Sequence, residues 1–176
     1  MRGLAERAPS GGASVSSRVS ALVAERPWVL PFASKMLAED RWYTARELGE
    51  AWGVRTSVVK RALWWLAKYG LAEKLEGEVT KYRLRPEAAA VLREKLSESW
   101  VDRNRLVVRL GRHYLVIAVR RKGVVVKSVD EGTVAKVHEA VRACGGFKVK
   151  DIAEASGLPP RLVSVALRVL RATGEL

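Results

Sequence analysis

The stretch that decides the fold is YTARELGEAWGVRTSVVKRALWWLAKYG, residues 43–70. Its apolar residues recur at three- and four-residue spacing on both sides of Gly53, which predicts two amphipathic helices joined by a tight turn. Thr44 followed by Glu47 is a capping-box pattern and predicts the start of the first helix. Gly70 stands where a glycine commonly ends a helix and predicts the end of the second.

The same pattern returns 104 residues later. FKVKDIAEASGLPPRLVSVALRVLRATG, residues 147–174, aligns with the first stretch without a gap, and both helix-ending glycines are conserved in it as Gly157 and Gly174. The preceding helices, expected near 32–40 and 136–144, also match. An internal repeat indicates a repeated structural unit. The second copy departs from the first at Pro159-Pro160, which occupies the turn.

Other elements are expected outside the two copies. Ser14 predicts the N-cap of a short helix. Residues 71–84 predict a β-hairpin with an acidic tip, and Pro86 predicts the start of a helix that extends to about residue 99. Residues 105–129 contain three β-branched runs separated by short turns, which predicts a three-stranded antiparallel meander.

The pattern LxxxWGVxxSVVKRxLxxLxxxGL, residues 48–71, resembles the winged helix superfamily, especially regulators of the MarR and ArsR type. The resemblance covers residues 32–85 well and 134–176 in part. It implies that the second helix of the pair enters the DNA major groove with its N-terminal residues at the base edges. It also implies that the helix over 87–99 is a candidate dimer element, although core packing explains its apolar face equally well.

The expected fold class is therefore α+β, mainly α, with tandem winged helix-turn-helix units joined by a three-stranded antiparallel β meander. The expected parts are a flexible N-terminus with a short helix, 1–27; winged helix domain 1, 28–99; a basic meander, 100–131; and helix-turn-helix domain 2, 132–176. We expect the wing of domain 2 to be absent or truncated.

Candidate DNA-binding residues follow from the resemblance. They are Arg55, Thr56, Ser57, Lys60 and Arg61 on the recognition helix of domain 1, Lys81 and Arg83 on its wing, and Arg161, Ser164 and Arg168 in domain 2. For the wing, ordinary solvated residues are the alternative. Leu162, Val165 and Val169 make the corresponding helix of domain 2 more apolar, so a protein partner is the alternative there.

The net charge of +13 favours a polyanionic partner. Residues 100–130 hold eight basic and two acidic residues, nearly half of that excess. Three interpretations of this stretch remain open: a second nucleic-acid surface, a dimerisation sheet, or a solvated face. The residues of the candidate surface are Arg105, Arg109, Arg112, Arg120, Arg121 and Lys122.

No catalytic, metal or cofactor site is expected. The sequence contains no phosphate-loop, nucleophile-elbow or HExxH motif, and His113, His138 and Cys144 match no zinc spacing. A redox-sensing role for Cys144 has no supporting charge nearby. No apolar run is long enough to span a membrane, and a single cysteine fits a reducing compartment, so a cytoplasmic location is expected.

The sequence thus predicts a sequence-specific transcriptional regulator that binds double-stranded DNA, as a homodimer or as a single chain with two working units. One alternative is a protein-interaction module with tandem winged helices, such as ESCRT-II-like subunits, chromosome-condensation partners or general transcription factor subunits. Its partner would bind through domain 2. Another alternative is a replication or partition protein that binds DNA.

Overall fold

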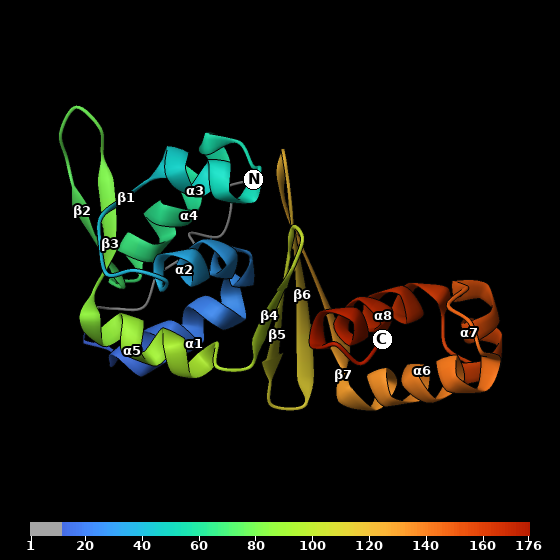
Figure 1. Cartoon of the computed structure of the whole chain (residues 1–176). Helices are drawn as coiled ribbons and strands as arrows, with labels where there is room; N and C mark the ends of the chain where they lie inside the picture. Colours follow the sequence, from blue (N-terminus) through green and yellow to red (C-terminus); the bar gives the residue numbers. More distant parts are fainter. Residues whose placement is uncertain (1–11) are drawn as a thin grey trace, which may run out of the picture. The chain divides into compact units, whose positions relative to one another are not determined.

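The computed structural model describes residues 12–176 and shows an α+β protein with two antiparallel sheets (Figure 1). The contacts divide the chain into two compact units. Unit 1 comprises Met1–Ser97 and Val119–Val124, and unit 2 comprises Glu98–Ala118 and Val125–Leu176. Each unit is described by itself.

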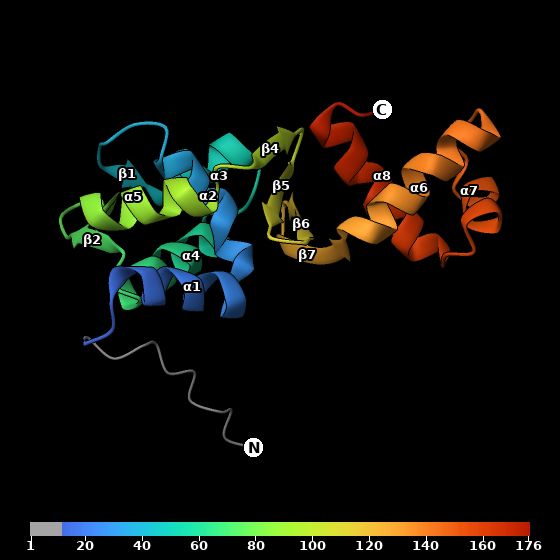
Figure 2. The ribbon, with the colours of Figure 1, turned by 90° about the horizontal axis from the view of Figure 1, so that it is seen from below.

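The helices of unit 1 follow the order that the sequence predicts. They are α1 (Val15–Glu25), the 3-10 helix η1 (Pro27–Val29), α2 (Leu30–Met36), α3 (Ala45–Trp52), α4 (Thr56–Lys68) and α5 (Pro86–Lys95). Ser14 caps α1 as expected. α5 packs along α1 (Figure 2), and its Ala88 and Leu92 are buried, so the apolar face of this helix is covered within unit 1.

A three-stranded sheet accompanies these helices. Its strands are β1 (Tyr43–Thr44), β2 (Ala72–Leu75) and β3 (Lys81–Leu84), in the order β1-β3-β2. The β2–β3 hairpin confirms the pair of strands expected around the acidic tip. β1 was not expected, because two residues are too few to show an alternating pattern. It pairs with β3 through Tyr43 opposite Tyr82.

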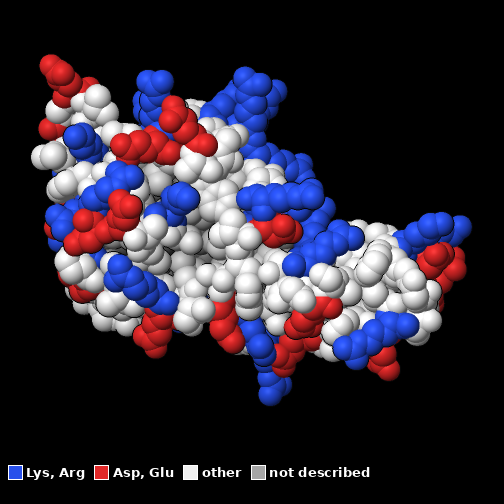
Figure 3. Space-filling view, in the orientation of Figure 1, with Lys and Arg blue, Asp and Glu red and all other residues white. Residues whose placement is uncertain are grey.

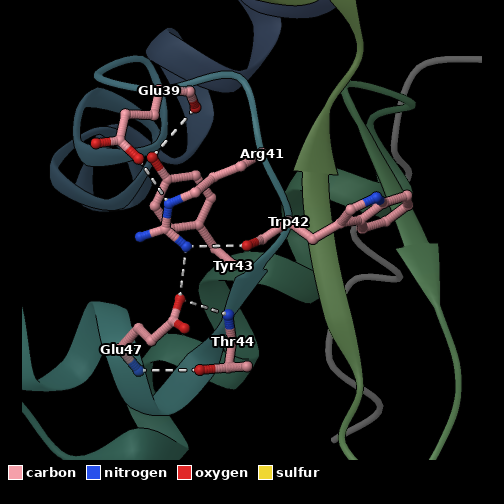
Figure 4. Close-up of polar contacts among 6 residues, drawn as sticks. All are labelled: Glu39, Arg41, Trp42, Tyr43, Thr44 and Glu47. Carbon is pink, nitrogen blue, oxygen red and sulfur yellow. Dashed lines mark hydrogen bonds and ion pairs between the residues drawn. The ribbon is translucent and has the colours of Figure 1, made fainter.

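The turn between α3 and α4 is built as the sequence predicts. Gly53 ends α3 with a φ of 67°. This left-handed backbone conformation is sterically unfavourable for any residue that has a Cβ atom, and glycine adopts it readily. At the start of α3, the Thr44 hydroxyl accepts a hydrogen bond from the Glu47 backbone N–H at 3.1 Å, and the Glu47 carboxylate accepts one from the Thr44 N–H at 3.3 Å (Figure 4). The predicted capping box is therefore confirmed.

The second sheet has four strands, so the prediction of a three-stranded meander is wrong. The strands are β4 (Ser99–Asp102), β5 (Arg105–Leu110), β6 (His113–Arg120) and β7 (Gly123–Asp130), in sequential order. The missed strand is β4, which begins where the helix over 87–99 was expected to continue. That helix ends at Lys95, and Trp100 and Val101 instead pair with Val107 and Leu106.

Unit 2 repeats the helix pair of unit 1. Its helices are α6 (Glu131–Cys144), α7 (Val149–Ser156) and α8 (Pro160–Thr173), and the bounds of α3 shifted by 104 residues are those of α7. Gly157 and Gly174 adopt φ values of 71° and 79°, close to those of Gly53 and Gly70. The backbone bond from Leu71 to Leu66 at 2.9 Å returns as Glu175 to Leu170 at 2.9 Å. The sequence repeat is therefore also a structural repeat.

The apolar character of α8 has an explanation inside unit 2. Val165 and Val169 are 2% and 1% exposed. They belong to a core cluster that includes Val107 and Val116 of the second sheet. Because these valines are covered by the same unit, they are not a free apolar surface. Leu162, the third apolar residue noted on this helix, is half-buried.

Candidate nucleic-acid interface

α4 presents one polar face and one apolar face. Val59 and Leu63 are fully buried, because they face the core of unit 1. The five predicted recognition residues of this helix are all exposed: Arg55, Thr56, Ser57, Lys60 and Arg61. Within residues 12–176, no side chain caps the N-terminus of α4.

The charges on this face are available for a ligand. Among residues 12–176, the side chains of Arg55 and Lys60 form no hydrogen bond or ion pair, and the Arg61 guanidinium lies 5.8 Å from the centre of the Trp28 ring. A cation without an internal partner gains most from a phosphate, because no existing pair must be broken. The side chains of Arg55 and Lys60 on α4 are therefore available to bind phosphate.

Several other basic residues of unit 1 are already paired with carboxylates. The Arg83 guanidinium donates two hydrogen bonds of 2.9 Å to the Asp40 carboxylate and thereby holds the pKa of Asp40 below its ordinary value. Arg46 lies 3.1 Å from Glu50. Arg41 contacts Glu39 at 2.9 Å and Glu47 at 3.1 Å (Figure 4). Arg83 is thus a weaker phosphate candidate than its position in the sequence suggested.

The tip of the β6–β7 hairpin, residues 119–124, lies in unit 1 beside the N-terminus of α4. The Arg55 backbone N–H donates a hydrogen bond of 2.9 Å to the Arg121 carbonyl oxygen. Arg120, Arg121 and Lys122 are all exposed. Figure 3 shows basic side chains gathered around the place where Figure 1 draws α3 and the upper end of β6 and β7. The tip adds three cations next to the first turn of α4.

A depression of about 400 Å³ marks this junction. Its walls include Arg46 from the first turn of α3, Arg55 and Thr56 at the start of α4, and Arg121 from the hairpin tip. In the sequence, Arg55 and Arg121 belong to two separate candidate surfaces. The structure brings them together, and it adds Arg46, which the sequence analysis missed because its i,i+4 pairing with Glu50 gives it the pattern of an ordinary surface residue.

A larger groove, about 570 Å³, separates α4 from the β2–β3 hairpin. Lys60, Trp64 and Lys74 line it together with Val79 of the hairpin tip. Trp64 is 50% exposed, whereas Trp65 is half-buried beneath the Arg26 guanidinium, which lies 3.8 Å from its ring centre. The two tryptophans therefore differ in exposure, and Trp64 is the one open to solvent.

The β2–β3 hairpin carries mixed charge. Lys81 is exposed on β3, and Lys74 lies 3.1 Å from Glu76. The tip itself, with Glu76 and Glu78, is acidic. Of the predicted hairpin contacts, Lys81 is therefore the one whose charge is open to solvent and unpaired among the described residues.

The candidate residues of unit 2 lie in different settings. Arg161 is exposed, whereas Ser164, Arg168 and Arg105 are half-buried and line one pocket. Arg109 lies 3.0 Å from Glu131, and Arg112 lies 3.9 Å from the same carboxylate. The six residues of the predicted second basic surface thus divide between the two units, and two of them are engaged with Glu131.

The structure offers no candidate metal site in its described part: residues 12–176 hold no group of three or more His, Cys, Asp or Glu side chains placed to bind an ion. His138 Nδ1 lies 3.5 Å from the Glu175 carboxylate, and Cys144 is exposed. None of the described helices is both long and apolar enough to cross a bilayer. Comparison of the chain with protein-family models, with curated proteins and with solved structures found no match.

Proposed function

We propose that the chain is a sequence-specific transcriptional regulator that binds duplex DNA through α4 of unit 1. The observation that carries the proposal is the exposed face of α4, where Arg55 and Lys60 are unpaired among the described residues and Arg55 lies beside the basic β6–β7 tip. Arginine can bond guanine with two parallel hydrogen bonds, and lysine binds phosphate.

The element order of unit 1 supports a winged helix. A helix, a short strand, the α3–α4 pair and a β-hairpin follow one another, and the short strand joins the hairpin as β1-β3-β2. In such a unit the second helix of the pair lies in the major groove. The β6–β7 tip would then reach the backbone near the N-terminus of α4, where Arg120, Arg121 and Lys122 can neutralise phosphates.

The salt dependence of DNA affinity tests this role. Duplexes are first selected from a random pool by the full chain, and affinity is then measured by fluorescence anisotropy over a salt series. Each phosphate contact contributes about 0.9 to the slope of log affinity against log salt. The Arg55→Ala/Lys60→Ala double variant is expected to lose at least tenfold in affinity and up to about two units of slope.

The matched control removes two basic residues of unit 1 that lie outside α4. Lys35 on α2 and Lys95 on α5 are exposed, so Lys35→Ala/Lys95→Ala lowers the net charge by the same amount. This variant is expected to bind within about twofold of the unaltered chain, since non-specific attraction is spread over the whole charge. Equal losses in both double variants would reduce the effect to net charge and would remove α4 as the reader.

A second candidate function is a protein-interaction module. It is favoured by the groove beside α4, where Trp64 is 50% exposed and Val79 is 58% exposed. Exposed aromatic and aliphatic side chains of this kind are common at protein interfaces. Failure of the full chain to bind any duplex at low salt would put this function first, and Trp64→Ala would then be the variant that weakens the partner.

A further inference from the structure

Unit 2 contains a depression whose walls are rich in arginine. Its volume is about 420 Å³, and it lies between the β4–β5 turn and one face of α8. The polar residues on its walls are Asp102, Arg103, Arg105, Ser164, Arg168 and Arg171. Four arginines against one aspartate give these walls a net charge of +3.

Most of this positive charge lacks an internal counterion. Among residues 12–176, the side chains of Arg103, Arg105 and Arg171 form no ion pair. The Nε atom of Arg105 is buried and has no hydrogen-bond partner in the described part of the chain. A buried guanidinium N–H without an acceptor is unfavourable, and an anion bound in the depression would relieve the charge that gathers there.

The backbone at Arg103 is a second, independent observation. Arg103 has a φ of 56° and is the only non-glycine residue among residues 12–176 with a positive φ. It is the first of the two residues that join β4 to β5, a position where positive φ favours Gly, Asn or Asp. A strained arginine on the wall of an arginine-rich depression indicates that the side chain is needed there.

The depression corresponds to the groove beside α4 in unit 1. Ala45, Lys60 and Trp64 line that groove, and their equivalents 104 residues later, Val149, Ser164 and Arg168, line the depression of unit 2. One strand of each hairpin contacts the helix, β4 against α8 and β2 against α4. The same position in the repeat thus has an aromatic wall in unit 1 and a cationic wall in unit 2.

We propose that this depression binds a small molecule that carries two linked phosphoryl groups. Near neutral pH, two linked phosphoryl groups carry about three negative charges, which match the charge of the walls. Arginine suits them, because its planar fork donates two hydrogen bonds to one phosphate. A DNA strand, by contrast, spreads its charges at about 3.4 Å intervals along the axis, whereas these arginines converge on one depression.

Isothermal titration calorimetry of the full chain with inorganic pyrophosphate tests the proposal. One saturable site is expected. The Arg103→Gln/Arg171→Gln variant is expected to lose at least tenfold in affinity, and both residues are exposed, so the fold should persist. The control is Arg142→Gln/Lys150→Gln, which removes two exposed cations of α6 and α7 outside the depression and should bind within twofold. Absent saturation, or equal losses in both variants, would overturn the proposal.

Arg103→Gly separates binding from folding. Glycine relieves the positive φ, so this variant is expected to raise the thermal midpoint while it lowers pyrophosphate affinity. Unchanged affinity in Arg103→Gly would contradict the proposed site.

Competition distinguishes the source of the phosphates. If a selected duplex displaces pyrophosphate and loses affinity in Arg103→Gln/Arg171→Gln, the arginines serve the DNA backbone and the proposal fails. The Arg55→Ala/Lys60→Ala variant should bind pyrophosphate unchanged, so failure of DNA binding through α4 and failure of this site can be told apart.

Discussion

Val165→Ala tests why α8 is apolar. Val165 is 2% exposed and lies in the core cluster of unit 2 with Val107 and Leu167. Its equivalent in unit 1 is Arg61, which is exposed. If α8 is apolar because it packs inside unit 2, truncation of Val165 should weaken the unit. If the helix is a docking surface for another protein, truncation should leave the stability unchanged.

The expected loss follows from burial. Val165→Ala removes two methyl groups, and each buried carbon contributes about 0.8 kcal/mol. The residual cavity adds to this, so the free energy of unfolding of unit 2 should fall by about 2 kcal/mol.

Urea unfolding followed by far-UV circular dichroism measures the total change, and amide hydrogen exchange of peptides from α6 and α8 assigns it to unit 2. Arg61→Ala is the control, and it should change the stability by less than about 0.5 kcal/mol, because an exposed side chain is removed. A change of that small size in Val165→Ala would refute the assignment of α8 to the core.

Three further predictions concern helix caps. Thr44→Ala should cost roughly 1 kcal/mol in urea unfolding, while Thr44→Ser should retain most of the cap. Lys148, the equivalent residue in unit 2, provides no side-chain cap, so Lys148→Thr should slow amide exchange in α7 and stabilise it by roughly 0.5 kcal/mol. The Thr133 backbone N–H donates to the Asp130 carboxylate and lowers its pKa below 3.8. The stability advantage over Asp130→Ala should therefore be complete above that pH and disappear as the pH falls through the lowered pKa; an undiminished advantage in acid would contradict this.

The helix pairs could be predicted because their signals are local. Thr44 with Glu47 specifies a helix start, and Gly53 specifies a turn, within a few residues of sequence. The repeat extends the prediction to unit 2. If the two units share one backbone, Gly157 should adopt the conformation of Gly53, as it does. The two helices of each pair accordingly lie close to their predicted positions, whereas α2 and α5 end about four residues before their predicted ends.

The short strands β1 and β4 could not be predicted, because they form only by pairing with a neighbouring strand. Tyr43–Thr44 becomes β1 only through its pairing with β3, about 40 residues away. Ser99–Asp102 continues the charged and apolar pattern of the preceding helix, yet it pairs with β5. For β1, a contact that is distant in sequence overrides a weak local preference, whereas β4 pairs with the strand that follows it after two residues.

The candidate site shows the same division. The exposed residues of α4 follow from helical spacing and from the resemblance to winged helices. Their position beside Arg121 does not, because the hydrogen bond from Arg55 joins residues from separate elements. The arginine pocket was missed for a similar reason: Arg103 and Arg171 belong to different elements, and only the fold brings them to one depression.

The two copies show how one backbone can carry different chemistry. At three equivalent positions, Lys60, Arg61 and Trp64 in α4 correspond to Ser164, Val165 and Arg168 in α8. The change from Arg61 to Val165 turns an exposed position into a core position, because the second sheet covers that face of α8. The change from Trp64 to Arg168 then adds a cation to the face that remains open. Because part of the surface of α8 is buried in the core of its own unit, fewer of its residues are exposed to contact a duplex. This is why we propose that α4, and not α8, reads DNA, and that α8 contributes to a site for a small anion.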